Sequence, residues 1–301
     1  MVQETVADRG LTPAPEAEGA EERERLVAAI AARVGSAQEA RWIVDHGGLD
    51  RARALADRRA AGEPLQYVLG RWPFRSLELQ VDRRVLIPRP ETEQVVEVAL
   101  GELALVQGRG GRRGAGPAMA VDLGTGSGAV ALSLAVEGAT DGDRLEVWAT
   151  DASPDALDVA RANLADLADA DPVAAARVHL AQGRWFAALP PALMGRVDLV
   201  VSNPPYVAES DYAGLDPVVR DWEPHSALVS ARGAAGVGGM ADIEAIVAGA
   251  PRWLHRSGAL VVEIAPSQAY AAIDAARRAG FSQVDTARDL AGRLRMLVAR
   301  R

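Results

Sequence analysis

The stretch V-D-L-G-T-G-S-G-A, residues 121–129, decides the fold. An apolar run ends there in glycines at alternate positions, Gly124, Gly126 and Gly128. Glycines so placed allow a tight turn after a buried strand, where a ligand can approach the main chain and the next helix N-terminus. Gly124, Gly126 and Ala129 also satisfy the G-x-G-x-x-G/A dinucleotide pattern. The stretch therefore predicts a nucleotide-like ligand without identifying it.

Apolar runs of strand length alternate with helical segments from residue 118 onward. Ser153-Pro154-Asp155 is a helix start, with an N-cap serine, proline in the first turn and an acidic residue near the positive end. Further helices are expected over Ala241–His255 and from Pro266 to Gly280. The seven expected strands are Ala118–Leu123, Leu145–Thr150, Val178–Ala181, Val197–Ser202, Gly258–Ile264, Phe281–Thr286 and Arg293–Ala299. This alternation favours a Rossmann-like α/β fold with a mostly parallel sheet covered on both faces.

The residues before this sheet predict a separate, smaller domain. Residues 1–20, rich in Pro, Glu, Ala and Gly, are expected to be a disordered leader. Residues 21–80 are expected to form a helical domain that docks the substrate, and 81–301 the catalytic domain. Within 62–86 the runs L-Q-Y-V-L and S-L-E-L-Q-V suggest a β-hairpin linker. A helix is expected after Thr92, and a loop over the Gly- and Arg-rich residues 108–117.

Composition and charge restrict the classes of function that we expect of this protein. The 301 residues carry a net charge of −8, which disfavours binding to nucleic-acid phosphates. The sequence has no cysteine and four scattered histidines, so we expect neither disulfides nor a metal centre. The N-terminus is polar and acidic, unlike a signal peptide, and no apolar run approaches the roughly 18 residues of a membrane span. We expect a cytoplasmic protein that contacts no membrane.

Asp151 ends the second expected strand, in W-A-T-D-A-S. A carboxylate at this position can accept hydrogen bonds from both hydroxyls of an adenosine ribose. Together with the glycine stretch it predicts a nucleoside ligand, which could still be NAD or S-adenosylmethionine.

The run N-P-P-Y, Asn203–Tyr206, follows the fourth strand and separates these two ligands. A planar amino group, such as a carboxamide or the exocyclic amine of adenine, has a delocalised lone pair and is scarcely nucleophilic. Its methylation needs acceptors that hold both N–H bonds, which the Asn203 side-chain oxygen and the Pro204 carbonyl can supply. Pro204 and Pro205 fix φ and add no competing N–H, and the ring of Tyr206 can stack on the flat group. The run therefore predicts methylation with S-adenosylmethionine as the donor.

These motifs resemble those of class I S-adenosylmethionine-dependent methyltransferases and, more narrowly, of the HemK/PrmC family. The resemblance covers residues 25–301. It rests further on Phe74 and the runs G-E-P-L-Q-Y-V-L-G (62–70), V-L-I-P-R-P-E-T-E (85–93), G-R-W-F (183–186), E-P-x-x-A-L (223–228) and D-L-A-G-R-L-R (289–295). The resemblance implies a seven-stranded methyltransferase sheet and transfer of a methyl group to the glutamine of the Gly-Gly-Gln motif in class I peptide chain release factors.

The resemblance also implies residue roles. Asn203, Pro204, Pro205 and Tyr206 would hold the glutamine. The residues that would contact S-adenosylmethionine are Gly124, Thr125, Gly126, Ser127, Gly128, Asp151, Trp185 and Asn203, with Trp185 near the adenine. The sequence departs from the family pattern at two places. Ala265 stands where the family usually has glycine, and the loop over 230–239 matches the usual family motif less closely. Arg89, between two prolines, is expected to stiffen the linker.

Three alternatives remain open. The substrate could be a ribosomal protein, or N-P-P-Y could serve the N6 of adenine in a nucleic acid. A non-catalytic nucleotide-binding module is the third. The acidic balance and the lack of a Lys-rich insertion favour a protein substrate, and we expect a monomer that acts on release factors in translation termination.

Overall fold

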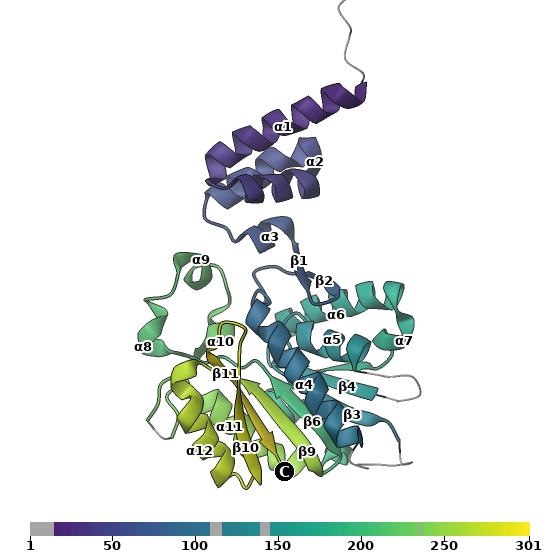
Figure 1. Ribbon diagram of the computed structural model, residues 1–301, viewed down its shortest axis with the longest axis vertical. Coiled ribbons are helices and arrows are strands. Elements are labelled where there is room, and N and C mark those ends of the chain that lie inside the picture. The colour runs from purple at the N-terminus through teal and green to yellow at the C-terminus, as the bar shows by residue number, and fades with distance from the viewer. Residues whose placement is uncertain (1–14, 109–115, 139–144, 235) are drawn as a thin grey trace, which may run out of the picture. The chain divides into compact units, whose positions relative to one another are not determined.

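The computed structural model describes residues 15–108, 116–138, 145–234 and 236–301 (Figure 1). The chain divides into two compact units, one reaching to Leu69 and the other beginning at Gly70. Within the described residues, no helix is both long and apolar enough to cross a bilayer. The expected loop at 108–117 lies mostly outside the described residues.

From residue 15 onward, the first unit consists of the helices α1 (Pro15–Val34), α2 (Ala37–Ala60) and α3 (Leu65–Leu69). Ser36 caps α2 by accepting from the N–H of Glu39, and Gly48 kinks the helix at a φ of 63°. The expected leader was wrong in part: α1 begins at Pro15, within it, while 1–14 lie outside the described residues. The run L-Q-Y-V-L is a helical turn rather than a strand, a common ambiguity of short apolar runs.

The hairpin does form, from β1 (Arg71–Phe74) and β2 (Leu77–Gln80), but it belongs to the second unit. The unit boundary at Leu69 therefore precedes the expected one at residue 80. Asn163 explains why: its Oδ1 accepts from Gln80 N (2.6 Å), and its Nδ2 donates to the carbonyls of Gln80 (3.0 Å) and Ser127 (2.8 Å). Phe74 and Leu79 are buried in the core of this unit.

A seven-stranded sheet of order β10-β11-β9-β6-β3-β4-β5 confirms the expected fold. All neighbouring pairs are parallel except those made by β11. The strands are β3 (Ala118–Leu123), β4 (Leu145–Asp151), β5 (Val178–Gln182), β6 (Val197–Ser202), β9 (Leu254–Glu263), β10 (Gln283–Arg288) and β11 (Leu294–Arg300). β9 starts earlier than expected and so ends the preceding helix at Trp253, while β10 is displaced towards the C-terminus.

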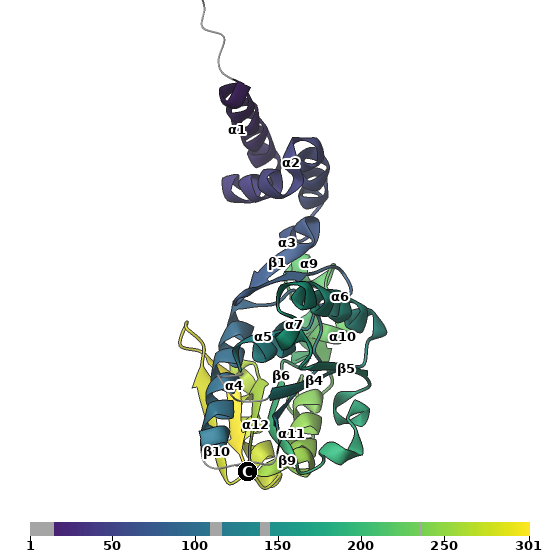
Figure 2. The ribbon, with the colours of Figure 1, turned by 90° about the vertical axis from the view of Figure 1, so that its right-hand side faces the viewer.

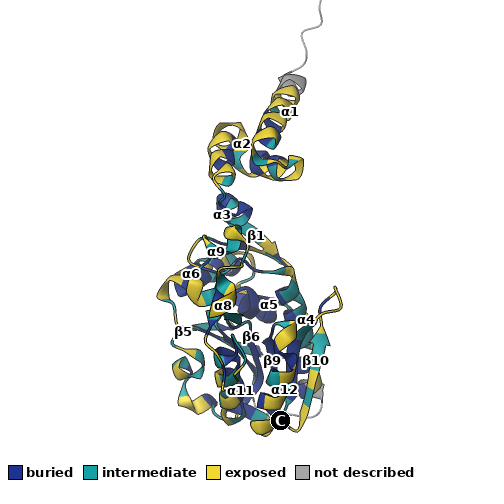
Figure 3. Ribbon diagram, turned by 90° about the vertical axis from the view of Figure 1, so that its left-hand side faces the viewer, coloured by how far each residue is buried: buried dark blue, intermediate teal, exposed yellow. Residues whose placement is uncertain are grey.

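Helices cover both faces of this sheet (Figure 2). On one face lie α4 (Pro90–Gly108), α5 (Ala129–Glu137), α6 (Pro154–Ala170) and α7 (Pro172–Ala175); on the other lie α11 (Ala241–Trp253) and α12 (Ala269–Arg278). Each face has its own apolar cluster, and the middle strand β6 is buried along its whole length (Figure 3). A strand buried on both faces reads as a continuous apolar run, which is why V-D-L-V-V-S is recognisable in the sequence.

The chain order reverses at β3. From β3 the chain proceeds to β4 and β5, then returns to β6 on the other side of β3. Ligands of open α/β sheets bind at the carboxyl ends of the strands at such a switch point. Short elements that the sequence did not predict follow β6: β7 (Val207–Ala208), α8 (Glu209–Tyr212), α9 (Pro217–Arg220), α10 (His225–Leu228) and β8 (Val229–Ser230). The described residues also contain 3₁₀ turns at Trp185–Ala188, Pro191–Leu193 and Pro266–Gln268.

Candidate active site

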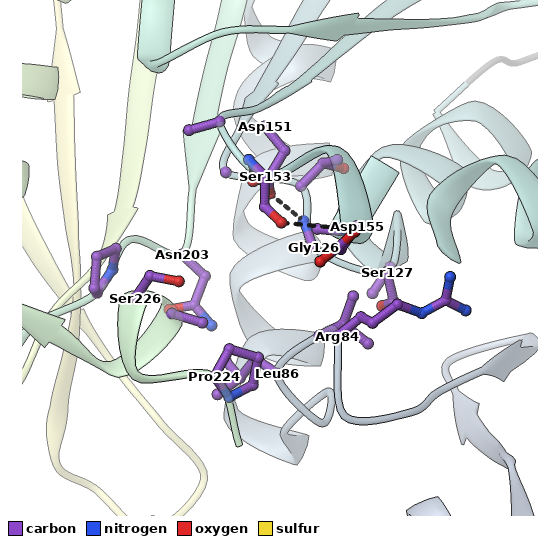
Figure 4. A pocket seen from close by; sticks show the side chains of 18 of the residues that line it. Arg84, Leu86, Gly126, Ser127, Asp151, Ser153, Asp155, Asn203, Pro224 and Ser226 are labelled. Carbon is purple, nitrogen blue, oxygen red and sulfur yellow. Dashed lines mark hydrogen bonds between the residues drawn. The ribbon is translucent and has the colours of Figure 1, made fainter. Parts of the chain in front are cut away.

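A cavity of about 590 Å³ opens at the switch point, beside the carboxyl ends of β3, β4 and β6 (Figure 4). Eight of the residues singled out in the sequence line it: Gly124, Thr125, Gly126, Ser127, Asp151, Trp185, Asn203 and Pro205. The Ser202 hydroxyl donates to the carbonyl of Leu123 (2.6 Å), which joins the end of β6 to the start of the glycine turn. Residues that are about 80 positions apart in the chain are thereby held at one sheet edge.

Asp122 stabilises the glycine turn, and it was not among the residues expected at the site. Asp122 accepts from the Thr125 hydroxyl (2.7 Å) and from the N–H of Ala131 at the start of α5 (3.2 Å). Burial raises the pKa of Asp122 to about 7, against the lowering effect of these two hydrogen bonds. Gly128 does not line the cavity; it is the N-cap of α5 in the left-handed conformation and packs against Leu132.

Asp151 faces the glycine turn. Its Oδ2 accepts from Gly126 N (2.9 Å) and its Oδ1 from Ser153 N (2.9 Å), as the dashed lines in Figure 4 show. Burial raises its pKa, while the backbone N–H groups of Ser153, Gly126 and Ala152 act to lower it. A carboxylate has about four lone-pair sites, so Asp151 retains capacity for ligand hydroxyls.

Trp185 forms part of the cavity wall and packs against Gly124. It adopts a φ of 50°, uncommon for a residue with a side chain, and its carbonyl accepts from the Thr150 hydroxyl (3.1 Å). Its indole Nε1 is buried and has no hydrogen-bond partner among the described residues. Leaving a buried donor without a partner costs free energy.

The N-P-P-Y run separates the first cavity from a second of about 210 Å³. Asn203 lines both cavities; Pro205 lines the first, while Pro204 and Tyr206 line the second. Within the described residues, no donor reaches the side-chain oxygen of Asn203 or the carbonyl of Pro204. Two hydrogen-bond acceptors therefore stand unused where the cavities meet.

A buried network behind this run was missed by the sequence reasoning. Asn203 Nδ2 donates to Thr92 Oγ1 (3.0 Å), and Thr92 Oγ1 donates to Glu263 Oε2 (2.7 Å). Tyr206 donates its hydroxyl to the other oxygen of Glu263 (3.2 Å), and its carbonyl accepts from Gln268 Nε2 (2.9 Å). Thr92 lies within P-R-P-E-T-E and Glu263 at the end of β9. Both segments were recognised in the sequence, but nothing in the sequence indicated that these two residues contact each other or Asn203.

The two departures from the family pattern are accommodated here. Ala265 has a φ of −73°, which any residue adopts, so no glycine is required there. In the loop over 230–239, Gly238 O accepts from Gln268, and a Cβ on Gly239 would lie 2.1 Å from the carbonyl oxygen of Tyr206. The loop therefore packs directly behind N-P-P-Y.

The segment before α4 also contributes to the site. Arg83, Arg84, Val85, Leu86 and Pro88 line the first cavity. Arg89, expected only to stiffen the linker, lines the second cavity and pairs with the buried Glu223, which also accepts from Ile87 N (3.1 Å). These bonds attach the linker to the E-P-x-x-A-L run, so both motifs border one site.

Comparison with known proteins agrees with this geometry. Residues 115–216 match the methyltransferase small domain. The chain is 40% identical over 249 residues to the release factor glutamine methyltransferase of Bifidobacterium longum (82% of this chain, 79% of the relative). It is 41% identical over 259 residues to that of Bordetella pertussis (86% and 82%). The solved N-terminal domain of human METTL16 in complex with SAH shares the fold, with a TM-score of 0.50, 16% identity and coverage of 80% and 81%. The identity and coverage show that the chain belongs to the release factor glutamine methyltransferase family.

Proposed function

We propose that the protein transfers a methyl group from S-adenosylmethionine to the side-chain amide nitrogen, N5, of the glutamine in the Gly-Gly-Gln motif of class I release factors. The observation that carries this proposal is the pair of unused acceptors, Asn203 Oδ1 and Pro204 O. A primary carboxamide has two N–H bonds in one plane, and two acceptors can hold both.

The first cavity suits S-adenosylmethionine. Its volume lies within the roughly 300–1,000 Å³ of small-molecule sites. Asp151 would take the ribose hydroxyls, the glycine turn would lie against the cofactor, and Trp185 would lie near the adenine. When bound, the cofactor supplies an electrophilic methyl group on its sulfonium.

The chain's own contribution is to position the amide. Its nitrogen is weakly nucleophilic because the lone pair is shared with the carbonyl. Asn203 and Pro204 would accept its two N–H bonds and aim the nitrogen from the second cavity towards the first. Such orientation and electrostatic stabilisation each contribute a rate factor of about 10² or more. Tyr206 would contribute an aromatic face for the flat group.

The first unit would dock the release factor. A glutamine side chain alone offers too few contacts to be selected among all others, so binding must use surface away from the reacting amide. Trp42 and Leu49 of α2 are 42% and 40% exposed, and large exposed apolar side chains can serve in such contacts. The net charge of −8 favours a protein substrate over nucleic acid, and we propose that the enzyme acts as a cytoplasmic monomer.

The test uses labelled S-adenosylmethionine with purified release factor, ribosomes and DNA in separate reactions. We expect label only in the release factor, on the Gly-Gly-Gln glutamine by mass spectrometry. Asn203→Ala should lower kcat by about 10²-fold or more. Label confined to ribosomal protein or DNA would show that this macromolecule, rather than the release factor, is the substrate. Normal turnover by Asn203→Ala would refute the proposed role of this side chain.

A further inference from the structure

The side-chain amide of Asn203 is anchored at one end only. Its Nδ2 donates to Thr92 Oγ1 at 3.0 Å, and Thr92 Oγ1 lies 2.7 Å from Glu263 Oε2. Thr92 is 4% exposed and Glu263 1% exposed, so bulk water does not substitute for these partners. The three side chains come from the loop after β6, the first turn of α4 and the end of β9.

The chemistry of the three groups fixes the direction of both hydrogen bonds in the series Asn203–Thr92–Glu263. An asparagine amide has nearly the same shape when its oxygen and nitrogen are exchanged, so its partners decide which end points where. A carboxylate can only accept, so the single hydroxyl proton of Thr92 goes to Glu263. The Thr92 oxygen then has only lone pairs left for Asn203, and only the NH₂ end of the amide can meet it.

We propose that Thr92 is a positioning residue that selects the orientation of the Asn203 amide, so that Oδ1 rather than Nδ2 faces the methyl acceptor. The inference rests on the proposed function, in which Asn203 accepts an N–H of the substrate. With the amide reversed, an NH₂ group would face the NH₂ of the glutamine, and two donors cannot hydrogen-bond to each other. Orientation therefore decides whether N-P-P-Y can hold its substrate.

Most of the polar groups around Glu263 favour the ionised form that this order requires. Its neighbours are the hydroxyls of Thr92 and Tyr206, the guanidinium of Arg295 on β11 and the carboxylate of Glu91 on α4. Burial raises the pKa of Glu263 and Glu91 adds to this, while the two hydroxyls and Arg295 act to lower it. The two hydroxyl donors and the guanidinium of Arg295 come from three separate parts of the chain, so the anchor does not depend on one contact.

A matched pair of substitutions separates the hydroxyl from the packing of Thr92. Thr92→Val keeps nearly the same shape and removes the hydroxyl, whereas Thr92→Ser keeps the hydroxyl and removes a methyl group. We expect Thr92→Val to lower kcat for release-factor methylation by about 10- to 100-fold. KM for release factor should change little, and Thr92→Ser should stay within about threefold of the parent.

Substituting Asn203 with alanine tests orientation itself, because the amide that Thr92 would orient is then absent. In the Asn203→Ala background, adding Thr92→Val should change the residual kcat by less than about threefold. The dissociation constant of S-adenosylmethionine, by calorimetry, and the melting temperature show in parallel that each variant is folded and binds cofactor.

Three results would overturn the inference: parental turnover by Thr92→Val, equal losses in Thr92→Val and Thr92→Ser, or an undiminished effect of Thr92→Val in the Asn203→Ala background. Failure of the proposed function is distinguishable, because the parent protein would then transfer no label to the release factor. An inactive Asn203→Ala beside a fully active Thr92→Val would remove only the role of Thr92.

Discussion

The indole of Trp185 lies so close to Gly124 that a Cβ built on this glycine would come within 3.1 Å of a ring carbon. Gly124 also has a φ of 75°, which side chains rarely adopt. The contact with Trp185 and the left-handed backbone each require glycine at position 124, and only the contact concerns the cavity wall.

Gly124→Ala should displace Trp185 and weaken S-adenosylmethionine binding by about tenfold or more, roughly 1.4 kcal/mol. Gly195→Ala is the matched control, since Gly195 does not line the cavity and has a φ of 69° and open space around its Cβ. Both variants carry the cost of about 1–2 kcal/mol for a side chain in left-handed backbone. Calorimetry showing equal cofactor affinity in the two variants would contradict the role of the Trp185 contact.

Asp151→Ala should weaken S-adenosylmethionine binding by about 1–3 kcal/mol, because ribose hydroxyls and the N–H of Gly126 lose their acceptor. Asp155→Asn is the control, since Asp155 lines the same cavity but is exposed. Its cofactor affinity should stay near that of the parent. An unchanged dissociation constant in a folded Asp151→Ala protein would exclude Asp151 from cofactor binding.

Tyr206→Phe should keep most of the turnover, because the ring remains and Glu263 retains its bond from Thr92. Losing the 3.2 Å bond from the hydroxyl to Glu263 should cost stability by about 1 kcal/mol, seen as a lower melting temperature. Tyr206→Ala should lose turnover. Equal losses in the two variants would show that the hydroxyl, rather than the ring face, serves the reaction.

Asp122 should make stability depend on pH. Its native pKa is about 7 against an ordinary value of 3.8, so between these values the folded state holds a proton that the unfolded state has lost. The contribution of Asp122 to the free energy of unfolding therefore falls as pH rises from 4 to 7. Urea unfolding across this range should show the fall in the parent but much less of it in Asp122→Asn. Parallel curves for the two proteins would place the pKa of Asp122 near its ordinary value.

A fragment of residues 70–301 should fold and bind S-adenosylmethionine but methylate intact release factor far more slowly than the full chain. A fragment beginning at residue 82 should be less stable, because it lacks the buried Phe74 and Leu79 and the pairing of Arg75 with Glu137. Matching rates for the 70–301 fragment and the full chain would show that the first unit does not dock the substrate. A short Gly-Gly-Gln peptide should be a poor substrate for the full chain.

Much of the fold and the cavity was predictable because the signals are local. A buried strand, a glycine turn and a strand-end aspartate each occupy a few consecutive residues, and the switch point follows from the alternation of elements. The Thr92 network was not predictable, since its two hydrogen bonds join residues 111 and 171 positions apart. The run L-Q-Y-V-L was mistaken for a strand because five residues show too little periodicity to distinguish the two periods.

The hairpin β1–β2 lies in the second unit, tied to α6 by Gln80 and Asn163 and reaching the glycine turn through Ser127. Every element that assembles the cavity thus lies after Leu69. The first unit can therefore diverge in sequence without altering a residue that lines either cavity. With the docking role that we propose for the first unit, changes confined to it would direct the same methyl-transfer site to other protein substrates, both in evolution and in the laboratory.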